Sequence, residues 1–324
     1  MAAAFKGIKR HYVVTMKSPL GAKASFWAHR PERSNMLMLR IMTKISLTLG
    51  RSAGRVVLYG IALYFFLFAP ASRRASKDYL GRVLGRQPHW RDGFRHVFSF
   101  ASTIHDRIYV LNDRFDLFAI RVHGQEIIDA ALAANRGALL MGAHLGSFEM
   151  LRAVARHHND IRASMAMYEQ NAQKLNAMLA AISPLAGQDI IPLGQIDSML
   201  RIGERLEEGG VVGILADRSL DHGQTRPIMF FGRLAYWPVA PFRMAAVVRR
   251  RLIFMTGLYG LGNRYDIHFE ALADFTDIGP ADREAAIDRA MHRYVAMLER
   301  YCRAAPYNWF NFFDFWEAPA APAK

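Results

Sequence analysis

A short apolar run that ends in a polar junction is the feature that most constrains the fold of this chain. Residues 137–141 read Gly-Ala-Leu-Leu-Met, and residues 142–149 continue as Gly-Ala-His-Leu-Gly-Ser-Phe-Glu. The run has the length of a buried strand, and the small residues after it are typical of a turn. The pattern therefore predicts a strand that ends near Gly142 and a helix that begins at Ser147 or Phe148, which is the start of a β–α unit.

The junction carries two side chains suited to proton transfer, His144 and, five residues later, Glu149. A His side chain takes up a proton near neutral pH, and a carboxylate can orient it and stabilise its protonated form. Gly146 and Ser147 let the chain turn between them and leave room for a substrate. Because α/β proteins place ligands past the carboxyl ends of their strands, we interpret His144 and Glu149 as a catalytic dyad. The alternative is a chance spacing of His and Glu.

Short apolar segments alternate with amphipathic stretches from about residue 125 onward, which predicts an α/β core. The predicted strands are Ala138–Gly142, Arg162–Met167, Ile190–Pro192, Val211–Leu215, Leu252–Tyr259 and Tyr265–Leu272. The predicted helices are Glu149–His158, Asn171–Ser183, Ile196–Glu208, Pro241–Arg250 and Ala281–Arg303. Residues 73–135 are predicted to be helical. We expect an α/β fold with a mixed, largely parallel sheet flanked by helices.

A second polar cluster, Asp217 and Arg218, follows the predicted strand Val211–Leu215. If the sheet is parallel here, this cluster lies on the same rim as His144, since the carboxyl ends of parallel strands share one edge. The Arg218 guanidinium is a candidate for binding a phosphate group. The alternative for this pair is a local ion pair on the surface.

Aromatic residues gather in two later segments. Phe230 and Phe231 precede Gly232, which predicts a tight turn with aromatic side chains that line a pocket. Their alternative is ordinary core packing. Residues 307–316 contain seven aromatic residues out of ten. We interpret this ending as an interfacial belt or as a lid over the core.

Positive charge is concentrated in the first part of the chain. The formal net charge is +14, and residues 1–121 hold 21 of the 42 Lys and Arg residues but only 6 of the 28 acidic residues. A basic segment can meet nucleic acid, anionic lipid or an acidic protein. No recognition motif for nucleic acid accompanies the charge, so we expect no nucleic-acid partner.

The basic residues accompany a long apolar tract. Val56–Ser72 has 17 residues without a charge, and Arg55 and Arg73 flank it. This length is the lower limit for a helix that crosses a bilayer. The preceding stretch Met36–Leu49 has the amphipathic pattern of a helix that lies among lipid headgroups. We expect residues 35–72 to form a membrane-associated helical segment that either spans the bilayer or enters and leaves on one side. The alternative is a buried helix of a globular domain.

Taken together, these motifs resemble the lysophospholipid acyltransferase-like superfamily, and more narrowly its bacterial branch of lipid A lauroyl and myristoyl transferases. That branch has a His-x4-Glu motif, which His144 and Glu149 match. It also has an Asp after a later apolar strand, which Asp217 matches, then Phe-Phe-Gly and a Pro, which residues 230–232 and Pro238 match. The resemblance implies a glycerolipid acyltransferase-like fold.

The resemblance covers about residues 35–316 and includes the aromatic ending. The chain departs from the branch at Arg218, where Gln is common, and at Ser183–Gln188, where the branch often has a basic turn. Both departures fall where the head group of a donor or acceptor would be bound. With the resemblance, the expected organisation is a flexible basic extension (1–34), the membrane-associated segment, an acyltransferase domain (73–316) and a tail (317–324).

The resemblance implies a membrane-associated acyltransferase that moves a fatty acyl chain from a thioester to a hydroxyl or amine of a lipid or glycolipid. His144 would be the general base, and Glu149 would orient its imidazole. Backbone N–H groups near residues 146–148 would stabilise the oxyanion. Residues expected to bind substrate are Gly146, Ser147, Asp217, Arg218, Phe230 and Phe231.

The resemblance also implies the partners of this reaction. The acyl donor would be acyl carrier protein (acyl-ACP) or coenzyme A (acyl-CoA), and the resemblance favours the carrier protein. Membrane lipid would be the other partner, at the cytoplasmic face of the bacterial inner membrane. No metal and no bound cofactor are implied. The chain has one cysteine, Cys302, which excludes an internal disulfide and a thiolate zinc site.

Two other functions remain open from the residues alone. A serine hydrolase would use Ser147 as its nucleophile with His144 as the base, although the segment lacks the Gly-x-Ser-x-Gly motif. A membrane-binding α/β protein without catalytic activity would need neither residue. The hydrolase predicts loss of activity in Ser147→Ala and a labelled acyl-enzyme in the parent protein. The non-catalytic protein predicts lipid binding that survives His144→Ala, without thioester turnover.

Overall fold

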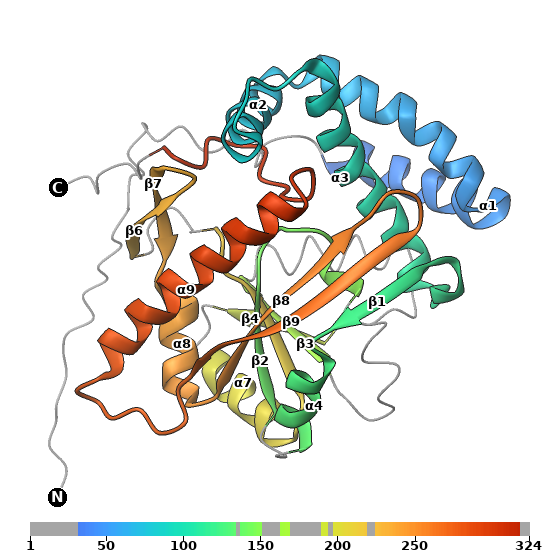
Figure 1. Cartoon of the computed structure of the whole chain (residues 1–324). Coiled ribbons are helices and arrows are strands. Elements are labelled where there is room, and N and C mark those ends of the chain that lie inside the picture. The colour runs from blue at the N-terminus through green and yellow to red at the C-terminus, as the bar shows by residue number, and fades with distance from the viewer. Residues whose placement is uncertain are drawn as a thin grey trace, which may run out of the picture.

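The main sheet of the computed structural model has seven strands in the order β1-β9-β8-β2-β5-β3-β4 (Figure 1). The described residues are 32–133, 137–150, 163–168, 189–193, 197–218 and 224–317. The strands of this sheet are β1 Ala119–His123, β2 Ala138–Gly142, β3 Ala163–Tyr168, β4 Asp189–Leu193, β5 Val211–Leu215, β8 Arg251–Tyr259 and β9 Arg264–Asp274. All neighbouring pairs are parallel except β8 and β9. The predicted mixed, largely parallel α/β sheet is confirmed.

All six predicted strands are present, and β2 and β5 have the predicted bounds. Three further strands were not predicted. One is β1, which lies at the sheet edge inside the region predicted to be helical. The others form a separate hairpin of β6 (Thr225–Phe230) and β7 (Arg233–Pro238). The tight turn predicted near Gly232 joins these two strands, and its two central residues both have positive φ, as a type I′ hairpin turn requires.

The central strand β2 is buried on both faces, which explains its unbroken apolar sequence. Its side chains alternate between two hydrophobic clusters because successive residues of a strand point to opposite faces. Leu139 and Met141 belong to the cluster that also holds the α9 side chains Tyr294 and Leu298. Leu140 belongs to the cluster on the other face. Helices therefore cover both faces of the sheet (Figure 1).

The helices around the sheet follow the amphipathic stretches of the sequence. They are α4 Gln125–Ala133, α7 Ser198–Glu207, α8 Ala240–Val248 and α9 Arg283–Ala304. The predictions for α7, α8 and α9 are confirmed to within a few residues. The predicted helix Asn171–Ser183, and Glu149–His158 beyond residue 150, lie outside the described residues. Residues 148–150 themselves form a short 3-10 turn, η2.

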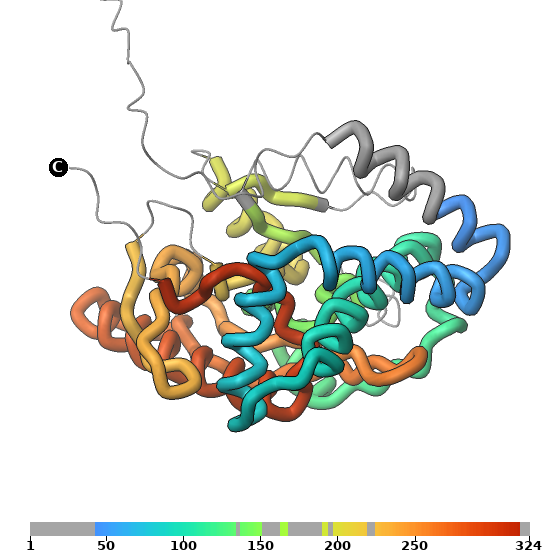
Figure 2. The backbone as a smooth tube through the Cα atoms, turned by 90° about the horizontal axis from the view of Figure 1, so that it is seen from above, coloured from blue at the N-terminus to red at the C-terminus, as the bar shows by residue number. Residues whose placement is uncertain are grey.

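Three helices precede the sheet in the chain: α1 Glu32–Phe68, α2 Pro70–Leu84 and α3 Trp90–Leu111 (Figures 1 and 2). The helix α1 covers most of the predicted membrane-associated segment. Among the described residues, Thr43–Phe68 is long and apolar enough to cross a membrane, judged by length and composition alone. Most of the predicted flexible extension (1–34) and all but the first residue of the predicted tail lie outside the described residues.

His96 of α3 connects this helix to α2 and to the aromatic C-terminal segment, residues 307–316. Its side chain is fully buried, with Nε2 at 2.8 Å from the carbonyl oxygen of Trp309 and Nδ1 at 2.8 Å from the hydroxyl of Ser76. A carbonyl only accepts, so Nε2 carries the proton and Nδ1 accepts from Ser76. Burial lowers the pKa of His96 to about 4, which keeps the ring neutral.

This depressed pKa predicts that acid destabilises the fold. Between pH 6.5 and 4 the unfolded chain binds a proton at His96 and the folded chain does not, so the free energy of unfolding falls as the pH falls. The contribution of this residue is about 3 kcal/mol over that window. Denaturant unfolding at pH 7 and pH 4.5 should show a smaller acid loss for His96→Gln than for the parent. His292→Gln, at an exposed position, should match the parent, and equal losses in all three proteins would contradict the prediction.

Candidate active site

His144 lies just past the carboxyl end of β2, and its main chain is held from two sides. Its backbone N–H donates to Oδ2 of Asp217 at 3.1 Å, and its carbonyl accepts from the backbone N–H of Phe310 at 2.7 Å. Its side chain is partly exposed, at 31%. The imidazole is therefore fixed in position and still open to a substrate.

Asp217 is the hydrogen-bond partner of the His144 ring. Nδ1 of His144 lies 2.8 Å from Oδ1 of Asp217. Asp217 follows β5, which pairs in parallel with β2 so that Gly142 faces Leu215. The prediction that this cluster and His144 share one rim is thereby confirmed. Because the carboxylate accepts a hydrogen bond from Nδ1, the proton of a neutral ring sits on Nδ1, and Nε2 is left as the basic nitrogen.

Asp217 is buried but ionised. Burial alone would raise its pKa, but the charge and hydrogen bonds of His144 and the charge of Arg218 outweigh burial and hold the pKa of Asp217 well below its usual range. Two more donors reach Oδ2, the indole N–H of Trp309 at 3.2 Å and the side-chain amide of Asn311 at 2.9 Å. The carboxylate thus accepts hydrogen bonds from two parts of the chain, the turn after β2 and the C-terminal segment.

Glu149 is also buried, and its carboxylate is bonded to partners other than the imidazole. Arg107 of α3 forms an ion pair with it at 2.6 Å, and the hydroxyl of Ser147 donates to it at 3.1 Å. The η2 turn thus directs Glu149 toward α3. The carboxylate bonded to the imidazole of His144 comes from Asp217, just after β5. The sequence predicts that Glu149 orients the imidazole of His144 and that Asp217 binds substrate. In the structure it is Asp217, and not Glu149, that is hydrogen-bonded to Nδ1 of His144.

The backbone of the turn after His144 packs directly against the backbone of β8. Gly146 has a φ of +73°, and a Cβ at this position would lie 2.0 Å from the carbonyl oxygen of Gly257. The N–H of Ser147 donates to that same carbonyl at 2.8 Å, and the N–H of Gly146 donates to the carbonyl of Asn308 at 2.8 Å. Two of the backbone groups predicted to stabilise an oxyanion are therefore already bonded within the protein.

Arg218 is held by the C-terminal segment that crosses the site. Its Nε donates to the side-chain oxygen of Asn311 at 2.7 Å, and its Nη2 donates to the carbonyl of Phe310 at 2.9 Å. The guanidinium lies 5.4 Å from the ring centre of Phe313. Burial lowers the pKa of Arg218, and the adjacent Asp217 opposes this effect. In this arrangement Arg218 fastens the C-terminal segment over the site.

The two predicted pocket aromatics lie in the core beside this segment. Phe230 has no exposed surface and packs against Trp309, with ring centres 5.2 Å apart. Phe231 is buried and lies under the guanidinium of Arg303. Phe230 therefore supports the indole that bonds Asp217, while Phe231 packs against Phe230 and Tyr79. Both pack as core residues. Most of the aromatic ending packs over the core: Trp309, Phe310, Phe315 and Trp316 are buried, while Phe313 is exposed.

Sequence reasoning missed the contributions of Arg107, Asn308, Trp309 and Asn311. Asn308 bonds the main chain of Tyr259 through both side-chain atoms, at 2.7 and 3.1 Å, and so joins the C-terminal segment to the end of β8. The only signal in the sequence was the polar Asn placed between aromatic residues.

Among the described residues there is no group of three or more His, Cys, Asp and Glu side chains that could hold a metal.

Comparison with known proteins adds a family to this geometry. Residues 35–317 match the protein family described as bacterial lipid A biosynthesis acyltransferase. The matched residues include α2, α3 and most of α1, the sheet, His144, Asp217 and the C-terminal segment. No individual curated protein matches the chain.

The close approach at Gly146 makes a prediction about stability. In Gly146→Ala the new Cβ meets a backbone oxygen and the left-handed conformation disfavours a side chain, so the variant should lose at least about 2 kcal/mol of unfolding free energy. Thermal or denaturant unfolding measures this loss. The control Gly203→Ala, in α7 with open space around its Cβ, should gain up to about 1 kcal/mol. Equal stability of the two variants would contradict the described turn.

Proposed function

Because the chain belongs to the bacterial lipid A biosynthesis acyltransferase family and is therefore an acyltransferase, we propose that His144 is its general base. The proposed reaction moves a fatty acyl chain from a thioester to a hydroxyl or amine of a membrane lipid or glycolipid. One observation carries the proposal: the partly exposed His144 ring is bonded at Nδ1 by the buried, ionised Asp217.

The geometry supports a mechanism without a covalent enzyme intermediate. Nε2 of His144 takes the proton from the acceptor hydroxyl or amine as its oxygen or nitrogen attacks the thioester carbonyl. Asp217 keeps the ring in the productive tautomer and stabilises the imidazolium that forms. The tetrahedral intermediate then collapses, the C–S bond breaks, and the imidazolium returns its proton to the departing thiolate. The products are the acylated acceptor and a free thiol.

Glu149 belongs to the same proposed site in a supporting role. Its carboxylate is neutralised by Arg107 and accepts from Ser147, and these contacts brace the turn that carries His144. The remaining substrate contacts are proposed at the mouth of the site. Gly146 and Ser147 would shape the turn that presents His144, since their N–H groups are bonded within the protein. Arg218 would take a phosphate of the donor or acceptor through donor groups not used by Asn311 and Phe310.

The proposed donor is acyl carrier protein, with coenzyme A as the alternative, since both present the thioester on an anionic phosphopantetheine arm. The basic first part of the chain suits an acidic carrier protein. We propose that residues 73–316 form the acyltransferase domain and residues 35–72 the membrane-associated segment. The proposed location is the cytoplasmic face of the bacterial inner membrane.

The serine hydrolase is less well supported by the contacts of Ser147. Its hydroxyl is buried and donates to Glu149, which leaves it directed away from the role of a nucleophile activated by His144. A protein without catalytic activity has no use for an ionised carboxylate buried against a partly exposed imidazole, which is costly to desolvate. Both observations favour the acyltransferase.

Thiol release from acyl-ACP and acyl-CoA, in the presence of a total lipid extract, tests the mechanism. His144→Ala and Asp217→Asn should each lower turnover by roughly 10²- to 10⁴-fold, since the first removes the base and the second its orientation and charge. Ser147→Ala should retain turnover within about tenfold, because it removes one hydrogen bond to Glu149. Mass spectrometry of the same reaction identifies the acylated acceptor.

The three variants separate the competing functions. Loss of activity in Ser147→Ala together with a labelled acyl-enzyme in the parent would support the hydrolase. Equal thiol release by the parent and His144→Ala, or no release with either donor, would overturn the His144 mechanism. Unfolding measurements on each variant show whether a loss of activity comes from a loss of fold.

A further inference from the structure

We propose that α1 anchors the protein on one leaflet of a bilayer, with its segment after Gly50 lying in the membrane plane and not crossing it. This inference rests on the membrane association proposed above and specifies its topology. Sequence and length alone permit either arrangement, because Thr43–Phe68 is long and apolar enough to span. The contacts of α1 with the rest of the protein favour the in-plane arrangement.

α1 packs along α3 over much of its length. The rings of Tyr59 and Phe98 stack with centres 4.3 Å apart, and the rings of Phe66 and Phe94 meet edge to face at 6.1 Å. The numbering rises along α1 as it falls along α3, so the two helices are antiparallel neighbours. A helix bound sideways to the catalytic core in this way cannot also stand across a bilayer with lipid all round it.

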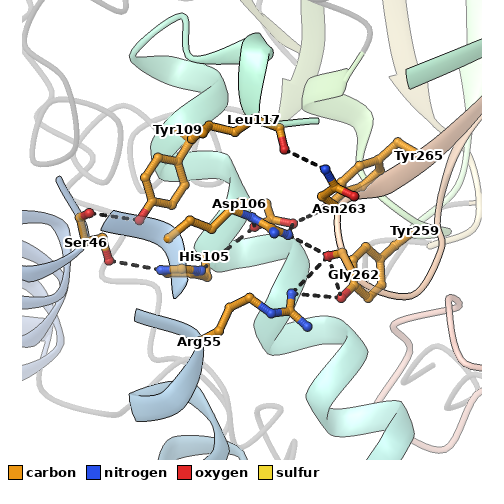
Figure 3. Close-up of polar contacts among 11 residues, drawn as sticks. Ser46, Arg55, His105, Asp106, Tyr109, Leu117, Tyr259, Gly262, Asn263 and Tyr265 are labelled. Atoms are coloured by element: carbon orange, nitrogen blue, oxygen red, sulfur yellow. Dashed lines mark hydrogen bonds and ion pairs between the residues drawn. The ribbon is translucent and has the colours of Figure 1, made fainter. Parts of the chain in front are cut away.

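Two arginines, Arg51 and Arg55, hold the start of this segment against the core. Figure 3 labels Arg55 and the partner residues Asp106, Gly262 and Tyr265. Arg51 forms a bidentate ion pair with the fully buried Asp106 of α3, at 2.7 and 2.8 Å. Asp106 also accepts from the hydroxyl of Tyr265 in β9, at 2.9 Å. Arg51 and Arg55 both donate to the carbonyl of Gly262 in the turn between β8 and β9, at 2.7 and 3.1 Å. These partners lie in α3 and in the turn between β8 and β9, so both arginines are held against the folded core.

The helix is also interrupted within the candidate span. Gly50 has φ +81° and ψ 170°, which is not a helical conformation, and the chain changes direction there (Figures 1 and 2). The segment that remains, residues 51–68, is about 27 Å long at 1.5 Å per residue, shorter than the roughly 30 Å of a hydrocarbon core. The tethered arginines stand at positions 51 and 55, which leaves residues 56–68 as the apolar part.

The outer side of this segment is apolar and exposed. The large apolar side chains with exposed surface in this segment are Val56, Val57, Leu63, Tyr64, Phe65, Leu67 and Phe68. Tyr59, which stacks on Phe98, is also partly exposed. Trp90, at the start of α3, is 65% exposed. The exposed basic residues Arg73, Arg74 and Lys77 follow on α2. An apolar helix face bordered by basic side chains fits a leaflet that contains anionic lipid, with the apolar side chains among acyl chains and the basic ones at the phosphates.

Cysteine labelling on preformed vesicles tests the topology with the full chain. The native Cys302 is buried and stays in place. Thr48→Cys and Lys77→Cys introduce exposed cysteines on either side of the segment, and Arg121→Cys on β1 is a control on the catalytic core. The protein is added to vesicles of phosphatidylethanolamine and phosphatidylglycerol, and a membrane-impermeant maleimide is applied before and after detergent. The in-plane arrangement predicts that all three react before detergent. Protection of Thr48→Cys until detergent is added would overturn it in favour of a span.

A second measurement tests contact with lipid. A fluorophore on Leu63→Cys should be quenched by brominated lipid at least several-fold more than the same fluorophore on Arg121→Cys. Equal quenching at the two positions would overturn the proposed membrane face.

His144→Ala should give the same labelling and quenching as the parent. Loss of thioester turnover with these patterns unchanged would count against the proposed function alone. Altered patterns in a protein that retains turnover would count against the proposed topology alone.

Discussion

The buried, ionised carboxylate of Asp217 at the rim of the sheet is the constraint on which the site depends. A buried charge is stable only when donors surround it. The donors here come from the turn after β2, through the backbone and ring of His144, and from the C-terminal segment, through Trp309 and Asn311. Residues more than 90 positions apart must therefore be assembled before this carboxylate is satisfied, and the same contacts hold the imidazole ready for substrate.

The two carboxylates of the site have different neighbours and so suit different tasks. Glu149 is paired with Arg107, a permanent cation, which cancels most of its field at nearby groups. Asp217 is hydrogen-bonded to the ring of His144, so in the proposed mechanism its charge stabilises the imidazolium that forms. The proposed mechanism thus gives the two acids separate roles: Asp217 orients the proposed base, and Glu149 braces the turn that carries it.

Much of the fold could be predicted because fully buried strands produce unbroken apolar runs, as in β2 and β5. The edge strand β1 could not, since its half-exposed residues include Arg121 and show no apolar run. The shared rim of His144 and Asp217 follows from parallel pairing alone. Which carboxylate reaches Nδ1 does not, because it depends on the turn at Gly146 and on C-terminal side chains whose partners only the folded chain brings near.

The position of the C-terminal segment has a consequence for biosynthesis. Residues 309–311 leave the ribosome long after the strand that precedes Asp217, and α1 emerges earlier than either. If α1 binds lipid as proposed, a nascent chain can reach the bilayer while Asp217 still lacks the indole and amide donors that satisfy it. The proposed site would then be completed late in translation, after the chain has met its lipid surface.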